Sequence, residues 1–165
     1  MSALSFETLL ANVVHGAARL ASRRFPKNFG VAPELVAAPV EGWVQVEGKR
    51  IHYLEWPGVE PTIVLLHGVA SNAYVWGRLG GNLGGHRTVA LTAPGHGSSD
   101  CDPAGYSTER VGTLLAMAAS ELAPGPKYLV GHSWGGKVAV VTAALLHESV
   151  MGLVLADPVP PRGMG

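Results

Sequence analysis

Short continuous apolar runs alternate along the chain with segments in which apolar residues recur every three or four positions. The continuous runs are typical of strands buried on both faces of a sheet, and the second spacing is typical of amphipathic helices. The runs predict parallel strands over Thr62–Leu66, Arg87–Leu91, Lys127–Val130 and Gly152–Ala156. The periodic segments predict helices over Asn72–Leu83, Ser107–Leu122 and Lys137–His147. This alternation predicts an α/β fold with a mainly parallel sheet and helices on both of its faces.

Two further strand-like runs, Trp43–Glu47 and Arg50–Trp56, precede the alternating part of the chain. The dipeptide Gly48-Lys49 separates them, and a glycine in so short a connection indicates a tight turn. We therefore expect an N-terminal antiparallel hairpin beside the parallel sheet.

The first 40 residues are expected to form a separate segment, an amphipathic helix and a Pro-rich linker, ahead of one domain over 41–165. Apolar residues recur at helical spacing over Ser5–Ser22, and Pro26, Pro33 and Pro39 follow. The segment lacks a basic region ahead of a continuous apolar core, as a secretion signal would have. No stretch approaches the roughly 18 apolar residues that a membrane-spanning helix needs. We expect a cytoplasmic protein without a membrane span.

Composition narrows the classes of function. The 165 residues include 12 Lys+Arg and 12 Asp+Glu, a balance that argues against a generally basic nucleic-acid binder. The single cysteine, Cys101, excludes a scaffold stapled by intrachain disulfides. Asp100 and Asp102 flank it, but no further metal ligands accompany them. The glycine pairs at 80–81 and 84–85 do not follow a strand in the way that phosphate-binding glycines do. We expect no metal and no cofactor.

The pattern Gly131-x-Ser133-x-Gly135 stands between a predicted strand and a predicted helix. A serine at such a place sits in a tight, strained turn that projects its hydroxyl above the sheet. The two glycines allow neighbouring backbone to approach the turn closely. The backbone N–H of Trp134, at the start of the helix, then points toward a developing oxyanion. The pattern predicts a nucleophilic serine at this turn.

A second candidate feature is His67-Gly68-Val69, at the end of the first predicted parallel strand. Acyl transfer needs a second N–H donor opposite the nucleophile, and the backbone N–H of Val69 is our candidate. The alternative is an ordinary glycine turn. For the His67 side chain itself we favour a structural role as a buried, hydrogen-bonded histidine.

Several motifs, in this order, resemble the N-terminal half of the α/β-hydrolase fold family. The resemblance runs from about Gly42 to Pro158 and rests on the hairpin, His67-Gly68, Pro94-Gly95-His96-Gly97-Ser98-Ser99-Asp100, Tyr106 and Gly131-His132-Ser133-Trp134-Gly135-Gly136. It implies a truncated α/β-hydrolase fold, in which the lid, the last strands and their helices are absent.

The resemblance also implies roles for particular residues. Ser133 would be the nucleophile, with the N–H groups of Val69 and Trp134 as oxyanion donors. A small-molecule acyl substrate would bind against His67, Gly68 and Trp134. A serine at this point argues against the dehalogenase and epoxide-hydrolase branches, which use Asp there. One departure is that the family commonly has Asp shortly before Pro-Gly-His-Gly, where this chain has Thr92-Ala93. We expect a local packing change from it.

The expected catalytic histidine is not found. In this family the acid and the histidine follow the serine in the chain. His147 is the only histidine after Ser133, and about 14 residues of helix put it roughly 20 Å away. His132 adjoins the nucleophile but is expected to point elsewhere across the strand. His96 is the best remaining candidate, although two strand spacings of about 4.8 Å separate its strand from that of the serine.

Asp157 is the candidate for the catalytic acid. It follows the last predicted strand, at the edge where open α/β sheets place their sites. Some members of the family carry the acid at this strand end, so Asp157 could orient a histidine. The alternative is a structural Asp in a rigid turn with Pro158.

The leading interpretation is a serine hydrolase that acts on an ester, thioester or related acyl bond through Ser133, with machinery that is incomplete in this chain. Gly152–Ala156 would then form an exposed apolar sheet edge. The chain could be part of a longer hydrolase, could be completed by self-association or by another chain, or could be a degenerate scaffold kept for binding. A non-catalytic interaction protein is therefore the main alternative, and a carbon–carbon bond hydrolase or a cofactor-free perhydrolase is a related one.

Overall fold

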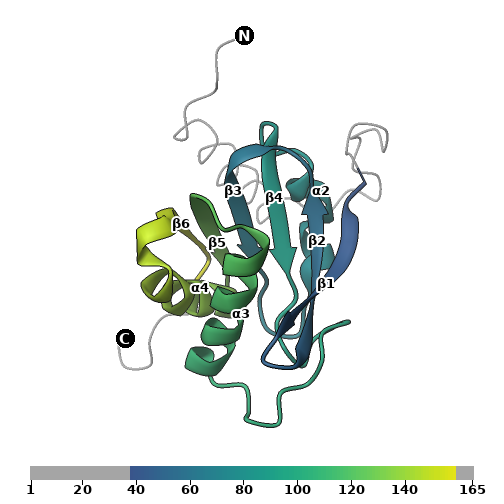
Figure 1. Ribbon diagram of the computed structural model, residues 1–165, viewed down its shortest axis with the longest axis vertical. Helices are drawn as coiled ribbons and strands as arrows, with labels where there is room; N and C mark the ends of the chain where they lie inside the picture. The colour runs from purple at the N-terminus through teal and green to yellow at the C-terminus, as the bar shows by residue number, and fades with distance from the viewer. Residues whose placement is uncertain (1–37, 159–165) are drawn as a thin grey trace.

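The computed structural model describes residues 38–158, which form a six-stranded sheet with helices packed on it (Figure 1). The predicted helix over Ser5–Ser22 lies outside the described residues. The strand order across the sheet is β1-β2-β4-β3-β5-β6. The strands are β1 (Val40–Val46), β2 (Lys49–Trp56), β3 (Val59–Leu66), β4 (His86–Leu91), β5 (Lys127–His132) and β6 (Val150–Ala156).

The sheet has an antiparallel side and a parallel side. β1 pairs with β2, and β2 with β4, in antiparallel register. β3 lies between β4 and β5, and β6 pairs with β5, all in parallel register. The N-terminal hairpin and the mainly parallel sheet are thus confirmed. The carboxyl ends of β3 and β4 point toward the lower part of Figure 1.

Helices cover both faces of the sheet, as predicted. α3 (Thr108–Leu122) and α4 (Trp134–Leu145) pack together on one face. Apolar side chains of both helices form one core cluster with β-strand residues such as Val64, Val89 and Leu129. A 3₁₀ turn, η2 (Ala73–Trp76), and the single turn α2 (Gly77–Gly80) lie on the other face. There Ala73 and Trp76 pack against Trp56, Leu65 and neighbouring strand residues.

Some predicted boundaries differ from the structure. The predicted helix over Asn72–Leu83 is only η2 followed by α2, because glycines at 77, 80 and 81 remove the side chains and the backbone preference that a longer helix needs. The strand predicted from Thr62 begins three residues earlier, since its first part pairs with His86 at the start of β4. α4 begins at Trp134 and not at Lys137, directly after the serine turn, and a short 3₁₀ turn, η3 (His147–Ser149), separates it from β6.

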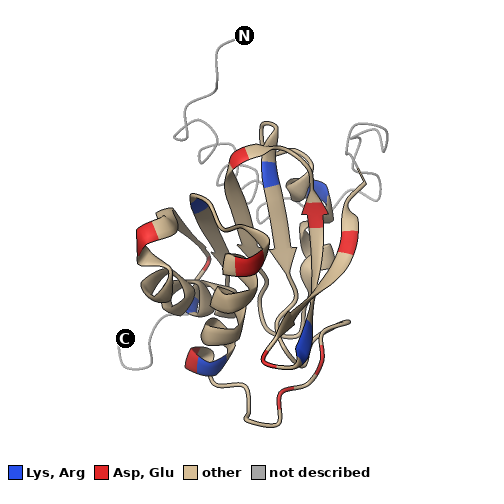
Figure 2. Cartoon of the chain, viewed as in Figure 1, with Lys and Arg blue, Asp and Glu red and all other residues tan. Residues whose placement is uncertain are grey.

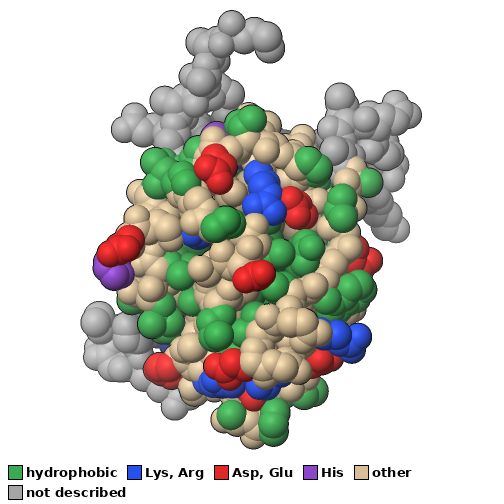
Figure 3. Space-filling view, in the orientation of Figure 1, with side chains coloured by type: hydrophobic (Ala, Val, Ile, Leu, Met, Phe, Trp, Pro, Cys, Tyr) green, Lys and Arg blue, Asp and Glu red, His purple; other side chains and the backbone are tan. Residues whose placement is uncertain are grey.

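Charge is distributed unevenly over the sheet. Lys, Arg, Asp and Glu gather around the turn between β1 and β2 and the start of α3 (Figure 2). β6 consists of Val-Met-Gly-Leu-Val-Leu-Ala and carries no charge. Met151, Leu153 and Leu155 of this strand are exposed, as are Val140 and Leu145 of α4. Apolar side chains therefore reach the surface on this side of the molecule. Figure 3 shows apolar side chains scattered among polar atoms on the face in view.

Candidate active site

Ser133 occupies a sharp turn between β5 and α4. Its backbone angles, φ 54° and ψ −121°, lie outside the regions that L-residues ordinarily populate. A side chain at Gly131 would collide with the backbone of Gly135, and one at Gly135 would collide with the carbonyl oxygens of Leu66 and His67. Both glycines of the pattern are therefore required by close approach of backbone, as expected. The start of α4 is pressed against the end of β3.

The turn after β3 faces this serine. A Cβ placed on Gly68 would lie 3.3 Å from the Cβ of Ser133 and 3.2 Å from Nδ1 of His132. The turn continues through Val69, which is exposed, to Ala70, whose φ is +56°. The predicted nucleophile and the predicted oxyanion turn are thus neighbours in space.

His67 is a buried structural histidine, with 2% of its surface exposed. Its Nε2 accepts a hydrogen bond from the backbone N–H of Ala93 at 2.9 Å, so its proton is on Nδ1, which donates to the carbonyl of Gly68 at 2.7 Å. Burial disfavours the charged imidazolium and lowers the pKa of His67 to about 4, against the smaller opposing effect of the Gly68 bond. Both ring nitrogens are in use, so this side chain has no free nitrogen with which to take a proton.

Trp134 and His96 stack at the edge of the same site. Their ring centroids are 5.7 Å apart with an interplanar angle of 21°, and His96 is also 5.2 Å from the ring of His67. Nε1 of Trp134 donates to the hydroxyl of Thr108 at 3.3 Å, which ties the indole to α3. Nδ1 of His96 donates to the carbonyl of Pro94 at 3.1 Å, which leaves Nε2 as the basic nitrogen of the neutral ring. Of the three candidate bases, His96 and His132 lie near the serine turn and His147 does not.

The other two candidates lie in different surroundings. His147 is exposed in η3, beyond the far end of the 12-residue helix α4, which corresponds to roughly 18 Å of helix. Asp157, in contrast, follows Ala156, whose carbonyl accepts a hydrogen bond from the backbone N–H of Ser133 at 2.9 Å. Asp157 is exposed, with φ +48°, and within residues 38–158 its carboxylate makes no hydrogen bond or ion pair.

Comparison with known proteins agrees with this architecture. The profile of the family described as alpha/beta hydrolase fold matches residues 61–164. The chain belongs to the α/β-hydrolase fold family. It is 36% identical over 126 residues to an esterase of Mycobacterium tuberculosis, covering 76% of this chain and 42% of that protein. It is 33% identical over 126 residues to N-formylmaleamate deformylase of Pseudomonas putida, covering 75% and 47%.

The fold is likewise shared with solved α/β-hydrolase relatives. The crystal structure of Cfl2 from Burkholderia cenocepacia is similar with a TM-score of 0.70 and 33% identity, over 81% of this chain and 47% of that one. The chain therefore spans less than half the length of these three relatives.

The position at which this α/β hydrolase departs from the family pattern has a defined structure. Thr92 is completely buried, and its hydroxyl lies 2.8 Å from Nδ1 of His52 and accepts the backbone N–H of Ala73 at 3.0 Å. Nε2 of His52 lies 2.9 Å from Oε1 of Glu41 on β1. Thr92, His52 and Glu41 are thus joined in a hydrogen-bonded network. Sequence reasoning missed Glu41 and His52, because they lie 11 residues apart and only the hairpin register brings them together.

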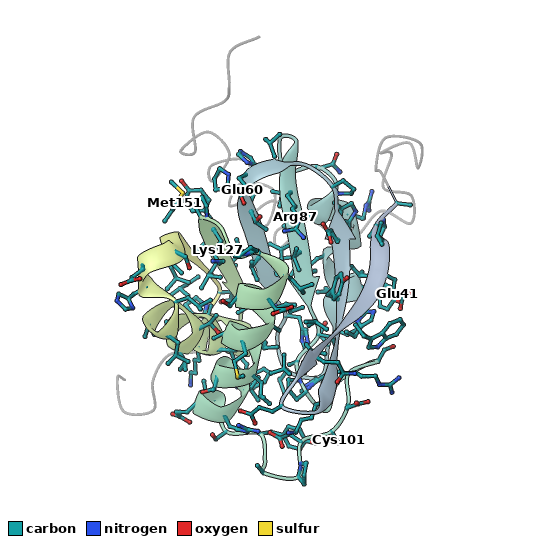
Figure 4. The ribbon with its side chains drawn as sticks, viewed as in Figure 1. Glu41, Glu60, Arg87, Cys101, Lys127 and Met151 are labelled. Carbon is teal, nitrogen blue, oxygen red and sulfur yellow. The ribbon has the colours of Figure 1, made fainter. Side chains whose placement is uncertain are left out.

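The loop that carries Cys101 is held by ion pairs. Asp100 pairs with Arg50 at 3.0 Å, and Asp102 with Arg110 at 2.6 Å. These hydrogen bonds lower the pKa of both carboxyl groups, first through the guanidinium in each case. Cys101 lies exposed at the lower end of the molecule in Figure 4. Within the described residues no group of three or more His, Cys, Asp or Glu is placed to hold a metal ion. Nor does this part of the chain contain a helix long and apolar enough to cross a membrane.

Proposed function

We propose that this chain carries the nucleophile and the oxyanion site of a hydrolase that cleaves an ester, thioester or related acyl bond. The observation that carries the proposal is the strained Ser133 turn facing the Gly68 turn across a few ångströms. Such strain is retained where the surrounding structure enforces it, and it is concentrated at functional sites. The named hydrolase relatives support the same class of reaction.

The reaction divides into two steps that this geometry suits. Oγ of Ser133 attacks the acyl carbon and gives its proton to a base, while the carbonyl oxygen becomes an oxyanion. The N–H groups of Val69 and Trp134 stabilise that oxyanion, and the latter belongs to the first turn of α4, where the helix dipole favours negative charge. The leaving group departs with a proton, and water then attacks the acyl-serine and releases the carboxylic acid.

The base comes from outside residues 38–158 in this proposal. His67 is neutral and both of its ring nitrogens are hydrogen-bonded, so it cannot accept the proton of Ser133. Asp157 stands beside the serine turn with a carboxylate that makes no bond in this region, a position suited to orienting an incoming histidine. His96, whose Nε2 is the basic nitrogen, is the alternative base.

The same segment that brings the base is proposed to pair with β6. The outer edge of β6 has no strand beside it in the described part of the sheet, and its apolar side chains are exposed. α4 beside it is apolar around most of its circumference, which is typical of a helix covered on every side. The relatives contain more than twice the length that this chain matches, so they have the residues to supply such a segment.

Labelling with a fluorophosphonate and intact-mass analysis tests the nucleophile. We expect one adduct, lost in Ser133→Ala and retained in Ser98→Ala, a control that removes an exposed loop hydroxyl. Because the base is outside this region, labelling should be slow. Added imidazole, as a replacement base, should accelerate it in proportion to its concentration.

The outcomes separate the proposal from its alternatives. A folded chain that forms no Ser133 adduct, with or without imidazole, overturns the proposal and favours a non-catalytic binding protein on a hydrolase scaffold. If labelling is fast without imidazole and this fast labelling is lost in His96→Gln, the base is His96. That result overturns the proposal that the base comes from outside residues 38–158, but not the proposal that Ser133 is the nucleophile.

A further inference from the structure

Glu41, His52 and Thr92 form a network of hydrogen bonds that the reaction above does not use, and Glu41 is its exposed end. His52 and Thr92 are both fully buried. The three side chains come from β1, from β2 and from the residue after β4, and the bonds between them measure 2.9 and 2.8 Å. Glu41 lies on the outer strand of the hairpin, at the right of Figure 4. This hydrogen-bonded network thus extends from the edge of the sheet, at Glu41, to the buried interior, at Thr92.

The chemistry of the groups fixes the direction of these bonds. An ionised carboxylate only accepts, so Nε2 of His52 carries the proton that it donates to Glu41. The pKa of Glu41 is lowered, first because the Tyr74 hydroxyl donates to its Oε1 at 2.6 Å, which keeps this carboxyl ionised. In the tautomer that carries its proton on Nε2, Nδ1 of His52 accepts the Thr92 hydroxyl proton. The Thr92 oxygen in turn accepts the N–H of Ala73.

Every bond therefore points the same way, from Ala73 through Thr92 and His52 to Glu41. Bonds arranged in this way polarise one another and hold their groups in one geometry. Tyr74, the residue after Ala73, also joins this network, because its hydroxyl donates a hydrogen bond to Glu41. The start of η2 is consequently attached to the hairpin at two adjacent residues.

The hydrogen-bonded network of Glu41, His52 and Thr92 fixes one end of the predicted oxyanion turn, the segment that follows β3. The turn runs from Gly68 to the start of η2, so the bond of Ala73 to Thr92 fixes where it ends. The other end is fixed by His67, which accepts the N–H of Ala93 and donates to Gly68. Adjacent residues, Thr92 and Ala93, thus anchor both ends of a turn that faces Ser133.

We propose that Glu41, His52 and Thr92 are positioning residues, which set the oxyanion turn through the Thr92 hydroxyl without touching the reacting atoms. The catalytic part of this proposal rests on the proposed function. The structural part, that the hydroxyl fixes the backbone of residues 68–74, does not depend on it. An oxyanion site acts only when its donors are held where charge develops, so loosening the turn should slow the reaction more than it weakens binding.

Hydrogen exchange of the backbone amides, followed residue by residue, tests the structural part. Thr92→Val removes the hydroxyl but keeps the shape, and Thr92→Ser restores the hydroxyl. Thr142→Val is the matched control, because it removes another fully buried threonine hydroxyl, which donates to Gly112 between α3 and α4. Relative to the globally protected amides, Ala73 should exchange at least about tenfold faster in Thr92→Val and at its normal rate in the other two variants.

The rate of Ser133 labelling in the presence of imidazole tests the catalytic part. In Thr92→Val the maximal labelling rate should fall about tenfold, with little change in the half-saturating reagent concentration, and Thr92→Ser should recover it. Equal exchange at Ala73 in all variants overturns the proposal, as does a loss in Thr92→Ser as large as in Thr92→Val. Absence of any Ser133 adduct overturns the proposed function, while the exchange data still decide the positioning role.

Discussion

The two edges of the sheet are built in different ways. β1 alternates exposed and buried residues along its second half, carries Glu41, and is tied to neighbouring loops by its side chains. One such tie is the bond from Nε1 of Trp43 to the carbonyl of Ser98 at 3.0 Å. β6 has no charge and exposes Met151, Leu153 and Leu155. Natural sheet edges that face water are usually protected by charge, by short length or by a covering segment. By this criterion β1 is a protected edge, whereas β6 lacks such protection and is the edge that we propose is covered by a further segment.

The difference continues into the helices behind each edge. On the hairpin side Arg110 of α3 bonds both to Asp102 and to Glu47 at the hairpin turn, with contacts of 2.6 and 2.7 Å. On the β6 side, α4 exposes Val140 and Leu145. Ion pairs thus hold the hairpin side, whereas apolar side chains are exposed on the side where we propose that the sheet continues. Three of the four following changes test this contrast, and the first tests the buried centre of the sheet.

The change with the greatest predicted effect on the free energy of unfolding concerns His67, which directly follows the central strand β3. His67 is neutral when folded, with its pKa lowered to about 4, whereas the unfolded chain gains a proton below about pH 6.5. The unfolded state thus binds more protons, and the free energy of unfolding should fall as pH drops from 6.5 to 4, by on the order of 3 kcal/mol from this group. Urea titrations should show a weaker pH dependence in His67→Gln. An unchanged dependence, or an equal change in the exposed control His147→Gln, would contradict this assignment.

A lysine placed on β6 tests the interface directly. When the chain is studied by itself, the open edge should pair with other copies, and Leu153→Lys should weaken that association about tenfold, since paired strands would bring like charges together. Sedimentation velocity over a concentration series measures the change. The matched variant Gln45→Lys, on exposed β1, should leave association as it is. Equal effects of the two lysines would remove the distinction between the edges.

Replacement of Arg110 tests the ion pairs on the hairpin side of the sheet. Arg110→Met should lower the thermal midpoint by roughly 5 °C, because the Asp102 carboxylate, which is 2% exposed, loses a close partner and the hairpin turn loses its tie to α3. Lys137→Met, on α4, is the counterpart on the other side and should shift the midpoint much less. Differential scanning calorimetry gives both values. A larger shift from Lys137→Met would reverse the proposed contrast.

The smallest effect is expected at the exposed face of α4. Val140→Gln should change the free energy of unfolding by less than about 0.5 kcal/mol, because Val140 is 47% exposed and contributes little burial. Val138→Ala, two residues earlier and almost completely buried, should cost about 1–3 kcal/mol. Guanidinium titrations compare the two. A cost above 1 kcal/mol for Val140→Gln would mean that this face is already covered.

Much of the fold follows from local pattern. Each parallel strand contains a short continuous apolar run, and Ser107 begins α3 as its N-cap, accepting the N–H of Arg110 at 3.1 Å. The turn between β5 and α4 can be identified from Gly131, Ser133 and Gly135, because the two glycines indicate a close approach of backbone. Local pattern fails at η2, where helical spacing of apolar residues competes with glycines, and at the start of β3, where Pro61 argues against a strand.

The hydrogen-bonded network of Glu41, His52 and Thr92 shows a different limit of prediction from the sequence. His52 is one residue in an otherwise strand-like run, and nothing next to it in the sequence indicates a partner. The pairing of Trp43 with His52 places Glu41 on the same side of the hairpin, and the N–H of Thr92 bonds to the carbonyl of His52. The first fact depends on the register of the hairpin, and the second on the approach of two segments 40 residues apart in the sequence. The sequence therefore supports the nucleophile turn better than it supports the residues that position its surroundings.

The strand order also has a consequence for synthesis on the ribosome. β3 ends at Leu66 but lies between β4 and β5, and β5 does not begin until Lys127. At ordinary translation speed the growing chain waits on the order of several seconds between the two. During that interval one side of a central strand whose second half, residues 63–66, is entirely apolar has no neighbour, so the nascent chain passes through an aggregation-prone state well before β6 has been made. Slower translation between 67 and 126 should lengthen that exposure, and chaperone binding should be strongest there.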